Sequence, residues 1–339
     1  MGYNNSAPSG ALVVPNFTLS DYESFFAAGA LGAMLSHAAV TRSYPFISHC
    51  FVSTDPKPCE LPTAIDVVKT RIQVDPAFKS HSLISGTRHI VSAEGPRVLL
   101  TGFGPTAVGY LAQGGAKFAG YEYWKRRFVL VAGDQETAVR HRTAIYLGAA
   151  AVAEFFADIL LTPLEATRIR LVSQKGYATG LVTGFTRLAR EGGIREMYAG
   201  FVPILFKQIP YALGQFTVNE LSHELVYRNI SDEQRKSLTP SSRLGIDMGS
   251  GVVAGFAAAV LSQPADTLLS KINKGQGPKR SMFRHLAEIL SEAGVRGLFA
   301  GLGPRMIMTA GLVSSQFVMY GGIKEALGAR SGVEIHKDN

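Results

Sequence analysis

Long apolar stretches that carry only a few charges alternate along this chain with shorter amphipathic ones. Residues 144–172 (AIYLGAAAVAEFFADILLTPLEATRIRLV), 244–272 (LGIDMGSGVVAGFAAAVLSQPADTLLSKI) and 105–128 each predict one long helix. Each exceeds the ~20 residues that a helix needs to cross a bilayer. Residues 178–193 place leucines and basic residues at helical spacing, which predicts a short amphipathic helix. The pattern therefore indicates a helical membrane protein.

Two motifs recur three times at nearly constant spacing. The first is centred on an acid, Asp66, Glu165 or Asp266, at intervals of 99 and 101 residues. The second follows each acid and contains two glycines seven residues apart, with a proline three residues further on. Its copies are EGPRVLLTGFGP (94–105), GGIREMYAGFVP (192–203) and AGVRGLFAGLGP (293–304). Two motifs in matched spacing indicate three tandem repeats, each of two long helices joined by a short one.

The repeats define the predicted domain organisation. A flexible tail is expected over 1–24, followed by repeats at 25–128, 141–228 and 243–328. The predicted fold is an all-α membrane protein, a six-helix barrel with pseudo-threefold symmetry. Small residues crowd the helices, as in GAAAVA, GVVAG and GALGA. Such crowding favours close packing between membrane helices over the alternative, a soluble helical repeat protein with polar faces.

Acidic residues lie on one side of the helix predicted at 144–172. Glu154, Asp158 and Glu165 fall within about 40° of one another at 100° per residue. A carboxylate that faces lipid is costly, so we expect these side chains to face a water-filled interior. Pro163 and Pro264 precede the motif acids by two residues and should kink their helices.

Bases follow two of the three motif acids. Lys69 and Arg168 stand three residues after their acids, whereas the third copy has Leu269. An acid of one helix could pair with a base of the next, so at most two such pairs are expected between motif residues. Partly solvated pairs contribute little net stability, which suits a gate that opens repeatedly. The alternative is a static ion-pair staple.

Composition adds an anionic ligand to this picture. Only 18% of the 339 residues are charged, below the roughly 25% of soluble domains, and the net charge is +8. We predict that Lys117 and Lys207 contact a small anion and that two amides donate hydrogen bonds to it, Gln113 and Gln208. Lys207 could instead snorkel to the interface. Cys50 and Cys59 form no disulfide or metal-binding framework.

A histidine suggests proton coupling. His37 lies in the apolar stretch GALGAMLSHAAV and matches the position of Asp158 when the copies are aligned on their helix starts. A histidine close to Glu154 and Asp158 could take up and release a proton near neutral pH. The alternative is a hydrogen-bonded core histidine.

These motifs resemble the mitochondrial carrier family, whose pattern is proline-x-acid-x-x-base followed by the glycine-rich second motif. The resemblance covers residues 25–328 and includes YEYWK (121–125), degraded to VNELSH (218–223) and YGGIK (320–324). It implies that the short helices face the matrix and that the outer gate carries less charge than the family pattern. It also implies a matrix-side gate that includes Asp66, Lys69, Thr70, Glu165, Arg168 and Asp266.

Within that family the resemblance is to its phosphate-transporting branch. It implies import of inorganic phosphate with a proton, or exchange for hydroxide, across the mitochondrial inner membrane, with His37, Glu154 and Asp158 in proton coupling. We expect a multi-pass protein that acts as a monomer beside anionic lipid such as cardiolipin. No cofactor, metal or nucleic acid is expected. No basic residue precedes Arg42, so no cleavable presequence is expected either.

Three other functions are considered. A carrier of another small anion, a dicarboxylate or a nucleotide, could share these groups, although the nucleotide type should carry several arginines where GLGPRMIMTAG (301–311) has one. A membrane enzyme could use His37, Glu154 and Asp158 as acid–base groups, but no catalytic motif supports it. A non-transporting adaptor would bury its charges without purpose.

The first copy contains an insertion. Its helix should reach the acid near position 44, yet the acid is Asp66, so residues 42–64 (RSYPFISHCFVSTDPKPCELPTA) are in excess. With four prolines, this segment fits no transmembrane helix. It is either a genuine loop near the matrix-side gate or a translated intron, and we favour the second.

Mass spectrometry of the native protein tests the origin of the insertion. A translated intron predicts that no peptide from the native protein spans residues 42–64. A recovered peptide across this segment would establish a genuine loop.

Overall fold

The computed structural model describes most of the chain outside the first and third inter-helix connections. The described residues are 15–52, 88–89, 92–93, 95, 103–174, 176–231, 234, 237–274, 291, 298–299, 302–329, 332–333 and 335. Side chains are not described for residues 37–52 and 268–274.

Six long helical segments form a closed ring, and every regular element in the described residues is helical. The segments are α1 (Leu19–Val52), α4 (Phe103–Ala132), α6 (Arg142–Ser173), the continuous α8 (Phe201–Ala212), η3 (Leu213–Thr217) and α9 (Val218–Arg228), α11 (Pro240–Lys274), and α13 (Leu302–Ala326). Each contacts the next along the chain, and α13 contacts α1 to close the ring. This confirms the predicted six-helix barrel.

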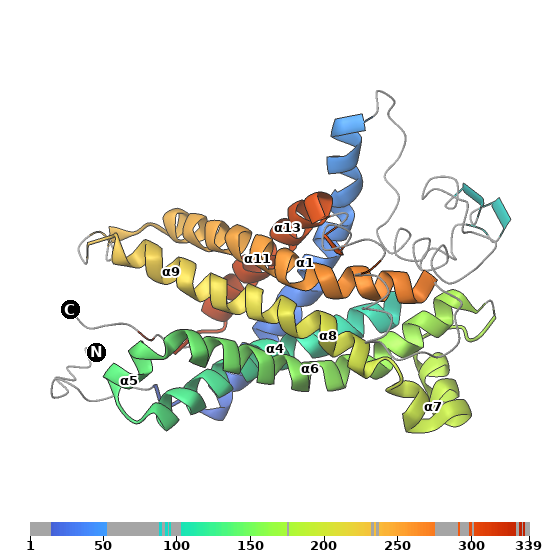
Figure 1. The fold of residues 1–339 in the computed structure, drawn as a ribbon, viewed down its shortest axis with the longest axis horizontal. Coiled ribbons are helices and arrows are strands. Elements are labelled where there is room, and N and C mark those ends of the chain that lie inside the picture. The colour runs from blue at the N-terminus through green and yellow to red at the C-terminus, as the bar shows by residue number, and fades with distance from the viewer. Residues whose placement is uncertain are drawn as a thin grey trace.

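Two short helices mark the ends of the bundle. α5 (Gln135–Arg140) lies at one end and α7 (Leu181–Met197) at the other, and the two are called here the α5 end and the α7 end (Figure 1). α7 is the short amphipathic helix predicted within the second repeat.

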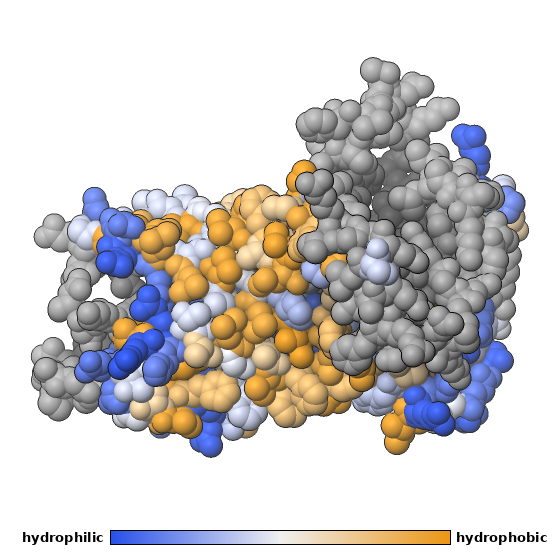
Figure 2. Space-filling view, in the orientation of Figure 1, coloured by the Kyte–Doolittle hydropathy of each residue, from blue (hydrophilic) through white to orange (hydrophobic). Residues whose placement is uncertain are grey.

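The outer surface of the bundle suits a lipid environment. The stretches Arg142–Val172, Ser241–Thr267 and Arg305–Ala326 are long and apolar enough to cross a membrane. Large apolar side chains such as Phe156, Leu261 and Ile307 are exposed on them. Figure 2 shows a hydrophobic band around the middle of the drawn face, with hydrophilic residues toward both ends. The helices therefore span the bilayer along the long axis of the molecule.

The two repeated motifs meet physically in the second repeat. Pro163 lies inside α6 and cannot donate a hydrogen bond to the carbonyl of Ile159, four residues earlier. The hydroxyl of Tyr198, from the second motif, donates to that oxygen at 3.1 Å. The tyrosine thus satisfies a polar group that the proline leaves open within the membrane.

The backbone conformation explains why the second motif begins with a glycine. Gly95 and Gly193 adopt φ values of 82° and 59°, a left-handed backbone that strongly favours glycine. Gly193 kinks α7 near its end and turns the chain back toward α8.

Small residues bring the helices into backbone contact, as predicted. A Cβ added to Gly255 of α11 would lie 2.5 Å from Ala310 Cα of α13, and one added to Gly214 of η3 would lie 2.7 Å from Ala258 Cα of α11. Gly114 of α4 approaches Gly29 and Ala33 of α1 in the same way. Because lipid gives helices no hydrophobic reason to associate, this close packing supplies much of their cohesion.

The first helix corrects two expectations. Residues 19–24 belong to α1 rather than to a flexible tail: Phe17, just before the helix, is buried against Phe25, and Thr18 caps α1 through a 2.8 Å bond from its backbone N–H to Asp21. At the other end, α1 continues through Arg42 to Val52, so part of segment 42–64 is helical. The expectation rested on four prolines, but three of them lie beyond Val52.

Glycine-to-alanine substitutions within α11 test the close packing. Gly255→Ala should destabilise the protein by about 1–3 kcal/mol, because its methyl group has no room against α13. Gly249→Ala in the same helix meets nothing within 4 Å and should be neutral or slightly stabilising. Thermal unfolding of the detergent-purified variants measures both, and equal midpoints would contradict this account of the α11–α13 contact.

Candidate functional site

A buried lysine lies at the centre of the candidate site. Lys117 of α4 is 5% exposed, and its Nζ donates to Gln215 Oε1 at 3.2 Å. Its ion-pair partner is Glu154 of α6, whose Oε2 lies 3.8 Å away. The rings of Tyr211 and Phe216 lie within 6 Å of the ammonium group. A charge removed from water in this way requires such partners.

Two carboxylates share one amide beside the lysine. Gln113 Nε2 donates to Glu154 Oε1 at 2.8 Å and to Asp158 Oδ1 at 3.3 Å. Both acids are fully buried, and Asp158 Oδ2 has no hydrogen-bond partner among the described residues. The structure thus brings together four residues predicted from the sequence, and α6 contributes both acids because they are one helical turn apart.

Two buried glutamines extend the cluster around Lys117 across the bundle, and neither was predicted from the sequence. Gln215 of η3 and Gln316 of α13 are 0% and 1% exposed, and Gln215 Nε2 donates to Gln316 Oε1 at 2.8 Å. A signal was present in the sequence. Lys117, Gln215 and Gln316 each stand 12 residues after the proline that ends the second motif, at Pro105, Pro203 and Pro304.

A layer of phenylalanines follows these three residues directly. Phe118, Phe216 and Phe317 pack edge to face, with ring centroids 5.1 to 5.9 Å apart. Tyr320 stacks on Phe118, and Tyr121 stacks on Phe216. We call Phe118, Phe216 and Phe317 the phenylalanine layer. It fills the centre of the bundle on the α5 side of Lys117.

An ion-pair network lies beyond this layer, toward the α5 end. Lys125 is 1% exposed and contacts Glu220 Oε1 at 2.6 Å and Glu122 Oε1 at 3.3 Å. The backbone N–H of Val333 donates to the other oxygen of Glu122 at 3.0 Å. Residues from α4, α9 and the C-terminal segment therefore meet where the degraded outer-gate motif was noted.

Ion pairs at the α7 end are more exposed. Asp266 of α11 contacts Arg305 of α13 at 2.7 Å and Lys207 of α8 at 3.1 Å. Lys207 is 43% exposed and Asp266 is 32% exposed at the side chain. Arg305 was not expected here, since the sequence analysis counted only the bases of the repeated motif.

The motif acid of the second repeat has an ion pair within its own helix. Arg168 Nη1 contacts Glu165 Oε1 at 3.1 Å within α6, and the pair anticipated between neighbouring helices stays a prediction. A spacing of three residues places these two side chains on the same face of the helix, so they can pair without a second helix.

Four side chains predicted for the site are not among those that the structure describes. Asp66, Lys69 and Thr70 lie outside the described residues, and so does the side chain of His37, whose backbone belongs to α1. Gln208 is half-buried on α8, next to Lys207.

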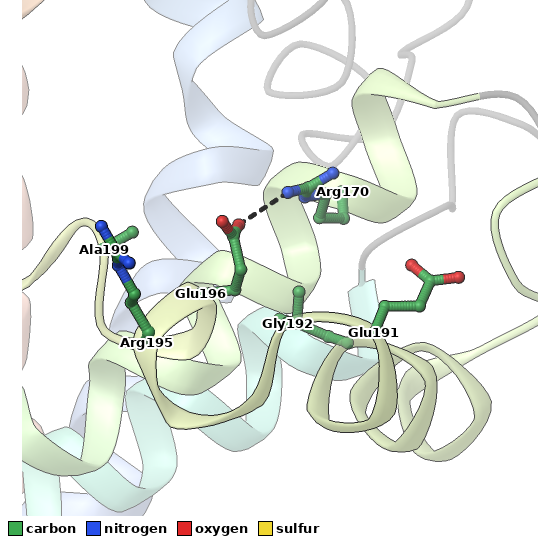
Figure 3. Close-up of a pocket in the computed structure, with 7 residues that line it drawn as sticks. Arg170, Glu191, Gly192, Arg195, Glu196 and Ala199 are labelled. Atoms are coloured by element: carbon green, nitrogen blue, oxygen red, sulfur yellow. Dashed lines mark hydrogen bonds and ion pairs between the residues drawn. The ribbon is translucent and has the colours of Figure 1, made fainter. Parts of the chain in front are cut away.

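A surface pocket of about 690 Å³ lies between α6 and α7, away from the cluster around Lys117. Its lining includes Arg170, Glu191, Arg195 and Glu196. Figure 3 shows Arg170 and Glu196 turned toward each other, 2.8 Å apart, so an ion pair ties α7 to α6. The lining of this pocket carries charges of both signs and lies outside the centre of the bundle. We therefore interpret it as a contact between α6 and α7 and not as the candidate site.

The ring of six helices and the repeated motifs define a class of membrane carrier. The sequence profile of the family described as "Mitochondrial carrier protein" matches residues 61–131, 140–229 and 241–331. The chain belongs to the mitochondrial carrier family and is therefore a transporter, not an enzyme.

Curated relatives indicate which members of the family the chain resembles. The chain is 42% identical over 266 residues to Mitochondrial substrate carrier family protein N of Dictyostelium discoideum, covering 78% of this chain and 88% of the relative. It is 36% identical to Solute carrier family 25 member 3 of Bos taurus, covering 77% and 70%. It is also 36% identical to the mitochondrial phosphate carrier protein of Caenorhabditis elegans, covering 78% and 75%.

Amide substitutions of two acids test the pairs at the α7 end. Asp266→Asn should lower the free energy of unfolding by about 1 kcal/mol, because it weakens contacts that join three helices. Glu165→Gln should cost less, since its described pair lies within one helix. Thermal unfolding in detergent provides the comparison, and a larger loss for Glu165→Gln than for Asp266→Asn would contradict the expected order of the two acids.

Proposed function

We propose that this protein transports inorganic phosphate across the mitochondrial inner membrane. The observation that carries the proposal is a lysine buried at the centre of the bundle, paired with one of two buried carboxylates. A single point charge with an amide beside it suits a small oxyanion. Relatives named as mitochondrial phosphate carriers, from Caenorhabditis elegans and Arabidopsis thaliana among others, support phosphate as that anion.

The charge balance of the buried cluster supports proton coupling. With both acids ionised, Lys117, Glu154 and Asp158 carry one net negative charge. Uncompensated charge is costly in a buried site, so the neutral cluster holds one proton on its two acids. A phosphate monoanion bound at Lys117 adds one negative charge, and a second proton on the acids restores neutrality. Phosphate and a proton would therefore move together, and Asp158 Oδ2 is a free position for the proton.

The two ends of the bundle suit alternating access. The phenylalanine layer and the Lys125 network close the centre toward the α5 end, which we assign to the intermembrane side. The pairs of Asp266 and Glu165 at the α7 end would form the matrix-side gate, together with Arg168, Asp66, Lys69 and Thr70. Lys207 would exchange its contact with Asp266 for a contact with the arriving anion, and Gln208 would lie beside it. Partly exposed pairs of this kind are weak enough to exchange partners.

The partners of the transporter follow from the same assignment. Gln113 would hold the anion beside Lys117, and His37 of α1 would pass the proton to the acids. A monomer encloses the whole route within its six helices, and anionic lipid such as cardiolipin would surround it.

Uptake of labelled phosphate into proteoliposomes tests the transport and its coupling. The wild-type protein should accumulate phosphate faster with an inward proton gradient. Glu154→Gln, Asp158→Asn and His37→Ala should each reduce gradient-driven uptake by about a hundredfold or more, the usual scale for loss of a proton-transfer group.

A matched control separates these effects from a loss of any acid. Asp134 caps α5 outside the bundle, where the backbone N–H of Thr137 lowers its pKa, and Asp134→Asn should transport normally. Uptake by the wild type that ignores the gradient would refute proton coupling. Absence of phosphate uptake would refute the proposed substrate.

A further inference from the structure

We propose that Lys117, Gln215 and Gln316 form a threefold donor ring that binds the tetrahedral anion directly beneath the phenylalanine layer. The inference rests on the proposed function and identifies two binding residues beyond those predicted for it. The three side chains come from the second long helices of the three repeats, at equivalent positions. They therefore surround the pseudo-threefold axis of the bundle.

Hydrogen bonds already join the members of this ring. Lys117 donates to Gln215, and Gln215 donates to Gln316, at 3.2 and 2.8 Å. The series then stops, because Gln316 Nε2 is buried and has no hydrogen-bond partner among the described residues. A buried donor without an acceptor costs free energy, and an oxygen of a bound anion would supply that acceptor.

The backbone of the second repeat is shaped to place Gln215. Pro210 lacks a backbone donor, and the chain then forms the π-helical turn η3, at whose centre Gln215 lies. A π-helical turn holds an extra residue relative to an α-helix, which rotates the side chains that follow it, and such turns are frequent at functional sites. Gly214 allows this turn to approach α11 at backbone distance.

The chemistry of the ring matches a tetrahedral monoanion. Lys117 supplies one positive charge, and the two amides supply neutral donors from the other two repeats. Three donors around a threefold axis match three oxygens of a phosphate group. The anion would replace the amide oxygens as acceptor for all three donors. A planar carboxylate offers two oxygens in one plane, so its shape matches three donors around a threefold axis less well.

The neighbouring residues give the ring a second consequence. Phe118, Phe216 and Phe317 follow Lys117, Gln215 and Gln316 directly in the sequence. An anion that displaces the three side chains of the donor ring would also displace the three phenylalanine side chains next to them. The donor ring would therefore bind the anion at the level where the phenylalanine layer closes the centre of the bundle.

Methionine substitutions test the amides with little change in volume. Gln316→Met and Gln215→Met should each raise the KM for phosphate uptake in proteoliposomes by about tenfold, since each removes a hydrogen bond to a charged ligand. The maximal rate should change less. Gln316→Asn keeps a donor on a shorter side chain and should restore part of the affinity. Ser314→Ala is the control, because that hydroxyl bonds the Met248 carbonyl of α11.

Thermal unfolding in detergent provides a second measurement that does not require transport. Phosphate should raise the midpoint of the wild type and of Ser314→Ala, and should raise those of the two methionine variants much less. Unchanged KM values and an unchanged phosphate effect in both methionine variants would overturn the ring. A lower midpoint without phosphate, together with an unchanged KM, would show the glutamines to be structural staples and would also overturn it.

Failure of the proposed function has a different outcome. If the wild type takes up no phosphate but is stabilised by it, and Gln316→Met loses that effect, the ring binds the anion and phosphate transport is refuted. If phosphate neither enters the vesicles nor stabilises the wild type, both proposals fail. If uptake is normal in the wild type and in both methionine variants, only the ring fails.

Discussion

A positive charge in the middle of a membrane bundle must be neutralised where it lies, and Lys117 imposes this constraint on the molecule. Its ammonium group reaches Glu154 on α6 and Gln215 on η3. The pairing holds three helices at fixed positions around the centre. Asp158 and Gln113 depend on it in turn, because the amide of Gln113 bonds both acids. Since none of these groups can be buried alone, the cluster is preserved or lost as a unit.

The three repeats give the bundle its symmetry, but the polar residues at its centre differ from one repeat to the next. The position of Lys117 is occupied by glutamine in the other two repeats, which leaves a single charge on the axis. The phenylalanine that follows is the same in all three copies. An apolar closure can thus be symmetric, whereas the site proposed for one small anion and one proton draws unequal contributions from the three repeats.

Much of the fold follows from patterns visible in the sequence. The repeats, the long helices and α7 were predicted, because period and length specify a membrane helix strongly. Four members of the cluster around Lys117 were predicted one by one, since charges in apolar helices stand out, but their pairing with one another was not. Gln215 and Gln316 were missed because only amides close to a lysine in the sequence were considered, and the π-helical turn at Gln215 changes which side chains face inward.

The pairings at the α7 end were less accessible from sequence. Arg305 contacts Asp266 from a helix whose own motif gives no sign of it. Relative rotation of long helices decides such contacts, and the repeat pattern does not specify it. The start of α1 was misplaced for a local reason, because a four-residue cap and buried Phe17 outweigh a polar composition.

The bond between Tyr198 and Ile159 depends on a side chain that the other two repeats do not share. The residue at the corresponding position is Leu100 in the first repeat and Phe299 in the third, and neither has a hydroxyl. In the third repeat a different hydrogen bond joins the two motifs, from the Thr267 hydroxyl to the Leu298 carbonyl at 2.7 Å. The connection between the proline-containing helix and the second motif is therefore present in both the second and the third repeat, while its donor moves from the second motif to the first.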